Sequence, residues 1–448
     1  MRTETQLIKD AEAIWRAGVA AVDSRSLVRS AVEFLESSFV VGDFEVPWDR
    51  DGKIIVVGAG KAGTGMARGL LDAIPTSLHN RVHGWVNVPD DCIDQIPRIH
   101  LHGARPAGVN EPTELGRQGA EKMLAMVAGA GPSDIVFCLI SGGGSALAPA
   151  PAEGLTIIEK QLLTQTLSAA GADIEQLNTV RKHLSQIKGG RLAAACRAPV
   201  LVSLVISDVL GDPLDVIASG MTMPDSTTSL DALKVMEHFD LVGDPRFAAS
   251  IATLRRAPVA SPSIQAESIS IVIGNNAVAV DAAGMEAERR GYSHAMTSAK
   301  RSEGHAEDIG RHLAKMARRM RDSPGPDCLI SGGEPIVALA PVNIRGKGGR
   351  NQQLCLAALS DMKLEGVEGV CLLSGGTDGE DGPTDAAGAR INVTVAENAA
   401  RAELNADEFL KRNDAYHFFD VAEGLIRTGP THTNVCDLRV IVVSRVEI

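Results

Sequence analysis

Aromatic residues are scarce in this chain, where Phe, Trp and Tyr together make up 3% of the 448 residues. Few rings are therefore available to stack unpaired bases, which disfavours a protein that binds single-stranded nucleic acid. Positive charge is also in deficit: 44 Lys and Arg stand against 56 Asp and Glu, for a formal net charge of -12. DNA, RNA and anionic membranes require a basic surface, so all three are disfavoured as partners.

Cysteine pairs and long apolar runs are missing as well. The seven cysteines include no C-x-x-C pair, and four of them, Cys138, Cys328, Cys371 and Cys436, lie in or beside apolar runs. Free thiols in such places behave as small hydrophobic groups, so we expect reduced, buried cysteines. The first residues carry acids and lack a signal peptide's apolar segment, and no apolar stretch is long enough to cross a bilayer. These absences favour a cytoplasmic protein.

Glycine, by contrast, is abundant, with 45 residues that gather after apolar runs and indicate turns. Helical spacing from 6 to 39 predicts two helices before any strand, followed by a linker at 42–52. Apolar runs then alternate with helical segments, which indicates parallel β-α units of an α/β fold. The expected strands are 54–57, 83–88, 135–140 and 200–206, and the expected helices are 62–74, 112–127, 157–169, 179–187 and 191–196.

The length of 448 residues exceeds what one hydrophobic core usually organises, which predicts two domains. The region 231–262 has no strong strand and ends in the proline-rich loop 257–262, so we place the boundary there, with domains over 1–257 and 258–448. The second domain should be a smaller α/β set. Its expected strands are 268–273, 295–298, 327–330, 369–373 and 439–443, and its expected helices are 277–290, 307–320 and 351–362.

Three apolar runs end in nearly the same residues, Cys138 to Gly143, Cys328 to Gly333 and Cys371 to Gly376. A buried strand that stops at Ser-Gly-Gly exposes consecutive backbone N–H groups with no Cβ in the way, which makes a nest for phosphate or carboxylate. The first copy continues as Ser141-Gly142-Gly143-Gly144-Ser145 and adds two hydroxyls. It lacks the G-x-S-x-G context of a nucleophilic serine, so it predicts an anion cradle, with a plain turn as the alternative.

The strand expected at 54–57 runs into Gly58-Ala59-Gly60-Lys61-Ala62-Gly63, a G-x-G-x-x-G between a strand and a helix. That context is the one a dinucleotide fingerprint requires. The acids after the next apolar run, Asp90 and Asp91, come late for a ribose contact, and Lys61 occupies an inner position. A lysine on a glycine turn at a helix N-terminus suits a phosphoryl group better, with a tight turn and a solvated lysine as the alternative.

A second concentration of positive charge lies at 178–191, where Lys188-Gly189-Gly190 interrupts a helical pattern. Such runs are usually solvated helix faces, but the glycine break favours binding. Asp208 follows the apolar run 200–206, so it lies at the carboxyl end of a strand, where open α/β sheets bind ligands. It is suited to orienting a substrate hydroxyl or to holding Mg²⁺, with helix capping as the alternative.

In the second half, Arg350 stands at the expected start of a helix, after Gly346-Lys347-Gly348-Gly349. Its guanidinium is suited to stabilising a phosphoryl group during transfer. The loop 377–388 packs four acids among glycines, and we expect these carboxylates to orient a ligand, although the composition also fits Ca²⁺ or Mg²⁺. His432, near the last strand, is more often a structural residue than a catalytic one.

Taken in order, these motifs resemble the class II glycerate 2-kinase family with its MOFRL-type C-terminal domain. The resemblance rests on Gly58 to Ala62, Ser141 to Ser145, His183-Leu184-Ser185, Lys188 to Gly190, Ser207 to Val209, Gly348 to Asn351, Thr377 to Gly379, Thr384 to Ala386, Thr431 and Asn434. It implies a Rossmann-like N-terminal domain, a smaller α/β C-terminal domain and an active site in the cleft between them. It also implies ATP-dependent phosphorylation of D-glycerate at the 2-hydroxyl, giving 2-phosphoglycerate, with Mg²⁺.

By this resemblance, the catalytic residues are Lys61, Arg350 and Asp208. The residues implied in substrate or nucleotide binding are Gly58, Gly60, Ser141, Gly142, Gly143, Gly144, Ser145, Lys188, Glu334, Asp378 and Asn434. No metal ligand is assigned, and the oligomeric state stays open, with a homodimer as one candidate.

Relatives in this family also carry the label hydroxypyruvate reductase of tartrate breakdown. Together with the G-x-G-x-x-G, that label makes an NAD(P)H-dependent hydroxypyruvate reductase the alternative function. A binding protein for small acids, without turnover, is a third hypothesis. Cations and glycines are spread over both halves of the chain, as phosphoryl transfer between domains would need, so the kinase hypothesis is favoured.

Overall fold

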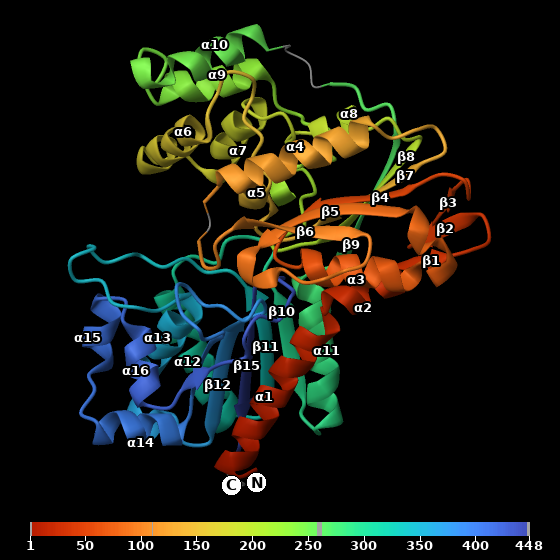
Figure 1. Ribbon diagram of the computed structural model, residues 1–448. Coiled ribbons are helices and arrows are strands. Elements are labelled where there is room, and N and C mark those ends of the chain that lie inside the picture. Colours follow the sequence, from red (N-terminus) through yellow and green to blue (C-terminus); the bar gives the residue numbers. More distant parts are fainter. Residues whose placement is uncertain (1, 110, 258–261, 446–448) are drawn as a thin grey trace. The chain divides into compact units, whose positions relative to one another are not determined.

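The computed structural model describes residues 2–109, 111–257 and 262–445, which form two compact units (Figure 1). One unit is Ser24–Ile273, here called the N-terminal domain. The other combines Met1–Asp23 with Gly274–Ile448 and is called the C-terminal domain. Both are α/β units, which confirms the predicted fold class.

The N-terminal domain contains a six-stranded sheet in the order β6-β5-β4-β7-β8-β9. Neighbouring strands from β6 to β8 run parallel, as expected for β-α units. β6, an edge strand, was not predicted from the sequence. The strands are β4 (Ile54–Ala59), β5 (Val82–Pro89), β6 (Ile99–Arg105), β7 (Ile135–Ile140), β8 (Val200–Ile206) and β9 (Glu267–Gly274).

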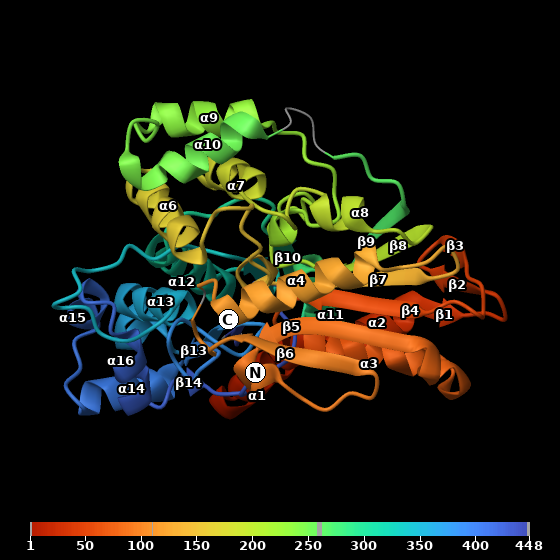
Figure 2. The ribbon, with the colours of Figure 1, turned by 45° about the horizontal axis from the view of Figure 1, so that its top comes forward.

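Helices cover both faces of this sheet (Figures 1 and 2). On one face, α4 (Glu114–Ala128) and α8 (Arg191–Ala195) pack on Val57 and Cys138. On the other face, α3 (Gly63–Ala73) lies between the sheet and α2 (Ser24–Ala31). A Cβ at Gly65 would lie 2.0 Å from Ser24 Oγ, so glycine permits the close approach of α2 and α3.

A further group of helices in the same domain has its own core, in which Leu163, Val180, Met236 and Phe247 are buried together. Helix α7 begins after the capping residue Asp173 and ends at His183, so it lies earlier than the predicted helix 179–187. The helices of this group are α6 (Ile157–Ala169), α7 (Ile174–His183), α9 (Ser229–His238) and α10 (Ala248–Arg256). The short helix α5 (Gly144–Leu147) contributes Leu147 to the core of the main sheet instead.

A small antiparallel sheet replaces the end of the predicted second helix and the first part of the predicted linker at 42–52. Its strands are β1 (Val32–Phe34), β2 (Ser38–Val41) and β3 (Phe44–Pro47). The Phe39 ring packs edge-on against Phe34 and against Phe137 of β7, each with centroids 5.2 Å apart. Burial of this aromatic group against the main sheet outweighs the helical spacing of the segment.

The C-terminal domain is built on a mixed sheet in the order β10-β11-β15-β12-β13-β14. The pair β10 and β11 is parallel, whereas the other neighbours are antiparallel. The strands are β10 (His294–Ser298), β11 (Cys328–Gly333), β12 (Val370–Gly376), β13 (Gly388–Ile391), β14 (Leu425–Ile426) and β15 (Asp437–Val443).

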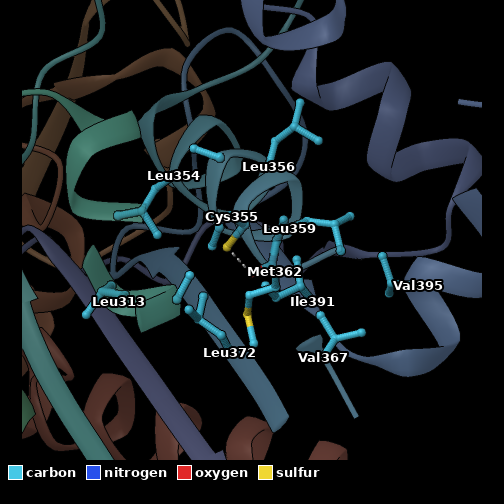
Figure 3. Packing of buried hydrophobic residues seen from close by; sticks show 14 of the residues in the cluster. Leu313, Leu354, Cys355, Leu356, Leu359, Met362, Val367, Leu372, Ile391 and Val395 are labelled. Atoms are coloured by element: carbon cyan, nitrogen blue, oxygen red, sulfur yellow. Dashed lines mark hydrogen bonds between the residues drawn. The ribbon is translucent and has the colours of Figure 1, made fainter. Parts of the chain in front are cut away.

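Helix α13 (Arg350–Gly366) provides much of the core on one face of this sheet (Figure 3). Leu354, Leu356 and Leu359 are buried there, and Cys355 Sγ donates to the carbonyl of Ala389 at 3.2 Å. All seven cysteines are buried free thiols, which confirms that prediction. The other helices of the domain are α1 (Glu4–Ala21), α11 (Asn276–Arg289), α12 (Ala306–Asp322), α14 (Val393–Arg401), α15 (Ala406–Lys411) and α16 (Ala415–Val421).

The domain boundary differs from the predicted division at 257 and 258. Helix α1, expected in the first domain, packs Leu7 and Trp15 in the C-terminal domain, where Trp15 Nε1 donates to the carbonyl of Leu438 at 3.1 Å. Strand β9, expected in the second domain, joins the N-terminal sheet, and Glu267 N donates to the carbonyl of Pro199 at 2.8 Å. Of the expected boundary loop, residues 258–261 lie outside the described residues.

Among the described helices, none has the length and hydropathy needed to cross a bilayer.

Candidate functional site

The central strands of the N-terminal sheet bring three predicted loops to one edge. β4, β7 and β8 are neighbours, and their carboxyl ends lead into Gly58–Gly63, Ser141–Ser145 and Ser207–Asp208. The first two loops are in close contact, because a Cβ at Gly60 would lie 1.9 Å from Ser141 Oγ. Gly60 also has φ of 156°, a conformation that favours glycine. The structure therefore places Lys61 and Asp208 at the predicted edge of the sheet.

The backbone N–H groups of the first loop are engaged within the protein. Gly60 N donates to the carbonyl of Asn87 at 3.2 Å, and Lys61 N donates to the carbonyl of Gly142 at 2.9 Å. Ala62 N donates to Ser141 Oγ at 3.0 Å. These three N–H groups are the ones a dinucleotide fingerprint would direct at a pyrophosphate. Because these N–H groups already have acceptors within the protein, binding of a nicotinamide dinucleotide at this loop is disfavoured. The Lys61 side chain is then the group that this loop offers to a ligand.

The second loop has the opposite character. Gly143 has φ of 77°, in the left-handed region, and it caps the short helix α5. Within the described ranges, the N–H groups of Gly142 and Gly143 have no hydrogen-bond acceptor. A Cβ at Gly143 would lie 3.2 Å from Arg105 Nη2 and 3.7 Å from Lys61 Cγ, so two cationic side chains flank this turn.

Arg105, which is 2% exposed, is a site residue that the sequence analysis missed. It closes β6, a strand that went unpredicted because its apolar alternation, Ile99-His100-Leu101-His102, is short and ends at Gly103. The available signal was an arginine after an alternating run, at the same end of the sheet as Lys61 and Asp208.

Ser145, at the other end of the glycine turn, is the centre of a second group of cations. Arg181 Nη2 donates to Ser145 Oγ at 2.8 Å. Lys188 Nζ donates to both Ser145 Oγ and the Ser145 carbonyl, the latter at 2.9 Å. Ser219 Oγ lies 3.0 Å from Ser145 Oγ. We call Lys160, Arg181 and Lys188 the basic cluster.

The basic cluster has no acidic partner in the described part of the chain. Lys160 Nζ donates instead to the carbonyl of Leu184 at 2.8 Å. Burial, with the charges of Arg181 and Lys160, holds the pKa of Lys188 well below its usual value. Burial also lowers the pKa of Lys160 to about 7, helped by the charges of Arg181 and Arg191. Strongly shifted ionisable groups of this kind mark functional sites.

The two residues that follow Arg181 on α7 have ordinary polar or acidic partners. Lys182 Nζ lies 3.4 Å from Asp225 Oδ1 and 3.6 Å from Asp215 Oδ2. His183 Nε2 lies 3.1 Å from Thr227 Oγ1. Adjacent cations on α7 thus differ: Lys182 faces carboxylates, whereas Arg181 faces the Ser145 hydroxyl.

In the C-terminal domain, the other two Ser-Gly-Gly copies are not nests. Both are strand residues on either side of β15, with Gly333 and Gly376 opposite Asp437. A Cβ at Gly332 would lie 1.6 Å from Asn276 Oδ1, and a Cβ at Gly375 would lie 3.0 Å from Trp15. Glycine is needed here because neighbouring side chains approach the strands closely.

Arg350 is the first residue of α13 and is held by acids. Its Nε and Nη2 donate to the two carboxylate oxygens of Asp437 at 2.7 and 2.9 Å, and its Nη1 lies 2.9 Å from Glu334 Oε1. The Asp437 side chain is fully buried. Burial raises the pKa of Glu334, and the charges of Asp437 and Asp378 add to this, while Arg350 opposes it. The structure thus brings the predicted residues Arg350 and Glu334 together.

The acidic loop 377–388 serves mainly to hold the fold. Asp381 caps α13, where its carboxylate accepts from the N–H groups of Asn351 at 3.0 Å and Gln352 at 2.8 Å. Burial raises the pKa of Asp381 to about 7, with a further contribution from Asp437. Asp385 accepts from Tyr416 Oη at 2.7 Å. These contacts correct the expectation that all four acids orient a ligand.

The remaining predicted residues lie in turns after β12 or before β15. Asp378 Oδ1 accepts from Glu380 N at 3.1 Å, and Asn434 Oδ1 accepts from Cys436 N at 3.4 Å. His432 has φ of 57° and is exposed. Across residues 2–109, 111–257 and 262–445, no three His, Cys, Asp or Glu side chains are arranged to hold a metal ion.

Comparisons with known proteins give the family. A family model described as "Domain of unknown function (DUF4147)" matches residues 10–253, and the MOFRL family model matches residues 327–437. The chain is 37% identical to D-glycerate 2-kinase of Thermotoga maritima, over 93% of this chain and 98% of that protein. The chain belongs to the class II glycerate 2-kinase family.

Other members of the family extend this relationship. Glycerate kinase of Rattus norvegicus is 32% identical, over 99% of this chain and 94% of the rat protein. A protein of Agrobacterium vitis named putative hydroxypyruvate reductase is 36% identical, over 88% of this chain and 87% of that protein. The crystal structure of a glycerate kinase from Thermotoga maritima matches with a TM-score of 0.81 and 33% identity, over 98% of this chain and 100% of that one.

Proposed function

We propose that this protein transfers the γ-phosphoryl group of ATP to the 2-hydroxyl of D-glycerate. The observation that carries the proposal is the turn Gly142–Ser145, which has cations at both ends in an otherwise acidic protein: Lys61 and Arg105 at Gly143, and Arg181 and Lys188 at Ser145. Such a site suits a small anion together with a phosphate chain. The names of the relatives support the same reaction.

In this reaction the 2-hydroxyl oxygen forms a bond to the γ-phosphorus while the bond from that phosphorus to the ADP oxygen breaks. Asp208 takes the hydroxyl proton or orients the hydroxyl. Lys61 and Arg350 neutralise negative charge on the transferring group, because such transfers depend mainly on positioning and charge stabilisation. An active site shared by the two domains is part of the proposal, since Lys61 and Arg350 belong to different ones.

The proposal treats Mg²⁺ as a partner of the nucleotide rather than as a resident ion. Mg²⁺ commonly binds proteins through one or two carboxylates, keeping several waters and using substrate phosphates as ligands. That mode agrees with the lack of a three-ligand group among the described residues. When bound, the ion would neutralise negative charge on the phosphates. Asp208 is the residue of this chain that we assign to holding it.

A coupled assay with ATP, Mg²⁺ and D-glycerate, followed by phosphorus NMR of the product, tests the reaction. We expect 2-phosphoglycerate from the wild type. Lys61→Ala and Arg350→Ala should each lower kcat on the order of 10³-fold, as loss of charge stabilisation does in other phosphoryl transfers. Lys122→Ala, which removes an exposed lysine on α4, is the matched control and should leave kcat unchanged. Near-normal turnover in either site variant would remove that residue from the mechanism.

The second candidate is an NAD(P)H-dependent hydroxypyruvate reductase, which the name of the Agrobacterium vitis relative favours. The engaged N–H groups of Gly60, Lys61 and Ala62 argue against it. Oxidation of NADH or NADPH by hydroxypyruvate, with no consumption of ATP, would establish the reductase and refute the kinase.

A further inference from the structure

The basic cluster contains more positive charge than the protein itself compensates. Arg181 and Lys188 both donate to Ser145 Oγ, and Lys160 donates to a main-chain carbonyl, so each cation has only a neutral partner. Lys188 is 3% exposed. Burying like charges without an acid is unfavourable, because desolvation and mutual repulsion add. A protein that keeps such a group has a use for it when an anion is bound.

The two ends of the turn Gly142–Ser145 differ in what they offer an anion. At Gly143, two backbone N–H groups without acceptors lie beside Lys61 and Arg105. That arrangement resembles the N–H nests that hold phosphate oxygens. At Ser145, the donors are a guanidinium, an ammonium and a hydroxyl. An arginine with a second donor beside it matches the planar, two-oxygen geometry of a carboxylate.

We propose that Arg181, Lys188 and the Ser145 hydroxyl bind the carboxylate of the hydroxy-acid substrate, leaving the Gly143 end of the turn for phosphate. This inference rests on the proposed function. Lys160 acts on the subsite through its charge and does not contact the substrate. Ser219, 3.0 Å from Ser145, orients the shared hydroxyl.

The subsite explains how the enzyme would reject uncharged alcohols. A neutral substrate such as glyceramide or glycerol leaves the buried charge of the cluster uncompensated, which costs binding energy that a carboxylate recovers. Specificity for small acids therefore comes from the cluster and not from the shape of the site alone.

Arg181→Gln is the decisive variant, because it keeps a polar group at the site and removes the charge. We expect the Kd of D-glycerate, measured by calorimetry without nucleotide, to rise about 10–100-fold, the range for a lost charge-assisted hydrogen bond. The KM for ATP should change less than about twofold. Arg255→Gln, which removes an exposed arginine on α10, should change neither value.

A specificity ratio separates a binding role from a structural one. The wild type should prefer D-glycerate to glyceramide in kcat/KM, and Arg181→Gln should reduce that preference about 10-fold or more. A merely structural defect would lower both values equally and leave the ratio unchanged. An unchanged ratio, an unchanged glycerate Kd, or a raised ATP KM with normal glycerate binding would each overturn the carboxylate assignment.

The outcomes also separate this inference from the proposed function. Wild-type protein that binds D-glycerate through Arg181 but never consumes ATP would refute the kinase and keep the subsite. If Arg181→Gln phosphorylates D-glycerate with an unchanged glycerate KM, the kinase is kept and the subsite is refuted. Arg181→Lys keeps the positive charge and should recover part of the affinity that Arg181→Gln loses. Both variants change a residue that is only half-buried.

Discussion

Two regions of this protein place cations at a proposed site in opposite ways. In the C-terminal domain, Arg350 is held by both oxygens of the fully buried Asp437 and by Glu334. In the N-terminal domain, Arg181 and Lys188 meet only the hydroxyl and carbonyl of Ser145. The charge of Arg350 is balanced by the fold, whereas that of the basic cluster is left for a ligand.

This contrast separates stability from binding. A cation that neutralises a buried acid is needed by the folded chain whether or not a ligand is present. A cation without an acid destabilises the ligand-free protein slightly and stabilises the complex. Removing an arginine should therefore have opposite effects on folding in the two domains.

The largest effect is expected for Arg350→Met. Asp437 would remain buried without its bidentate partner, which typically costs about 3–5 kcal/mol of unfolding free energy. Urea unfolding followed by circular dichroism measures this loss. The double variant Arg350→Met with Asp437→Asn should recover part of it, because no buried charge is then left unpaired.

Arg311→Met is a matched control, because it also removes an arginine that pairs with an acid in the C-terminal domain. Arg311 pairs with Glu307 at 2.8 Å on the surface, with 42% of its side chain exposed. Exposed pairs contribute about 0–1 kcal/mol, so this variant should unfold almost as the wild type does. If Arg350→Met loses no more stability than Arg311→Met, the balanced-charge interpretation of Arg350 is wrong.

The positions of many of these charged residues relative to the strands could be predicted from the sequence, but their partners in the fold could not. Lys61, Asp208 and the loop Ser141–Ser145 were each predicted to follow a strand, as they do, because glycine turns and acids after apolar runs mark strand ends. The three Ser-Gly-Gly copies look alike, yet only the first leaves its strand. The other two are extended by pairing with β15, which comes some 60 to 100 residues later, and local sequence does not report such pairing.

Distant contacts also explain the other differences. Helix α1 was correctly expected as a helix, but its apolar face gives no sign that it packs beyond residue 274. The acid partner of Arg350 is 87 residues away, and Arg105 lies on an unpredicted strand. The sequence shows which residues carry charge, whereas the contacts formed in the folded protein determine which of those charges have an acidic partner.

A smaller effect of opposite sign is expected for Arg181→Met in the absence of ligand. Repulsion on Lys160 and Lys188 falls, so the unfolding free energy should stay equal or rise by up to about 1 kcal/mol, most clearly at low salt. Urea unfolding at two salt concentrations measures this change. A loss comparable to that of Arg350→Met would mean that Arg181 is structural, and the distinction between the two domains would fail.

A pH dependence is expected from Lys160, whose pKa is lowered from 10.5 to about 7 by burial and by Arg181 and Arg191. Between those values the unfolded chain holds the proton more tightly than the folded chain does. Stability should therefore rise from about pH 7 toward pH 10, and Lys160→Met should flatten that rise. Thermal unfolding at pH 6.5, 8 and 9.5 compares the two proteins, with Lys122→Met as the exposed control. If the melting temperatures of the wild type and Lys160→Met change in parallel with pH, the pKa of Lys160 is not lowered in the folded state.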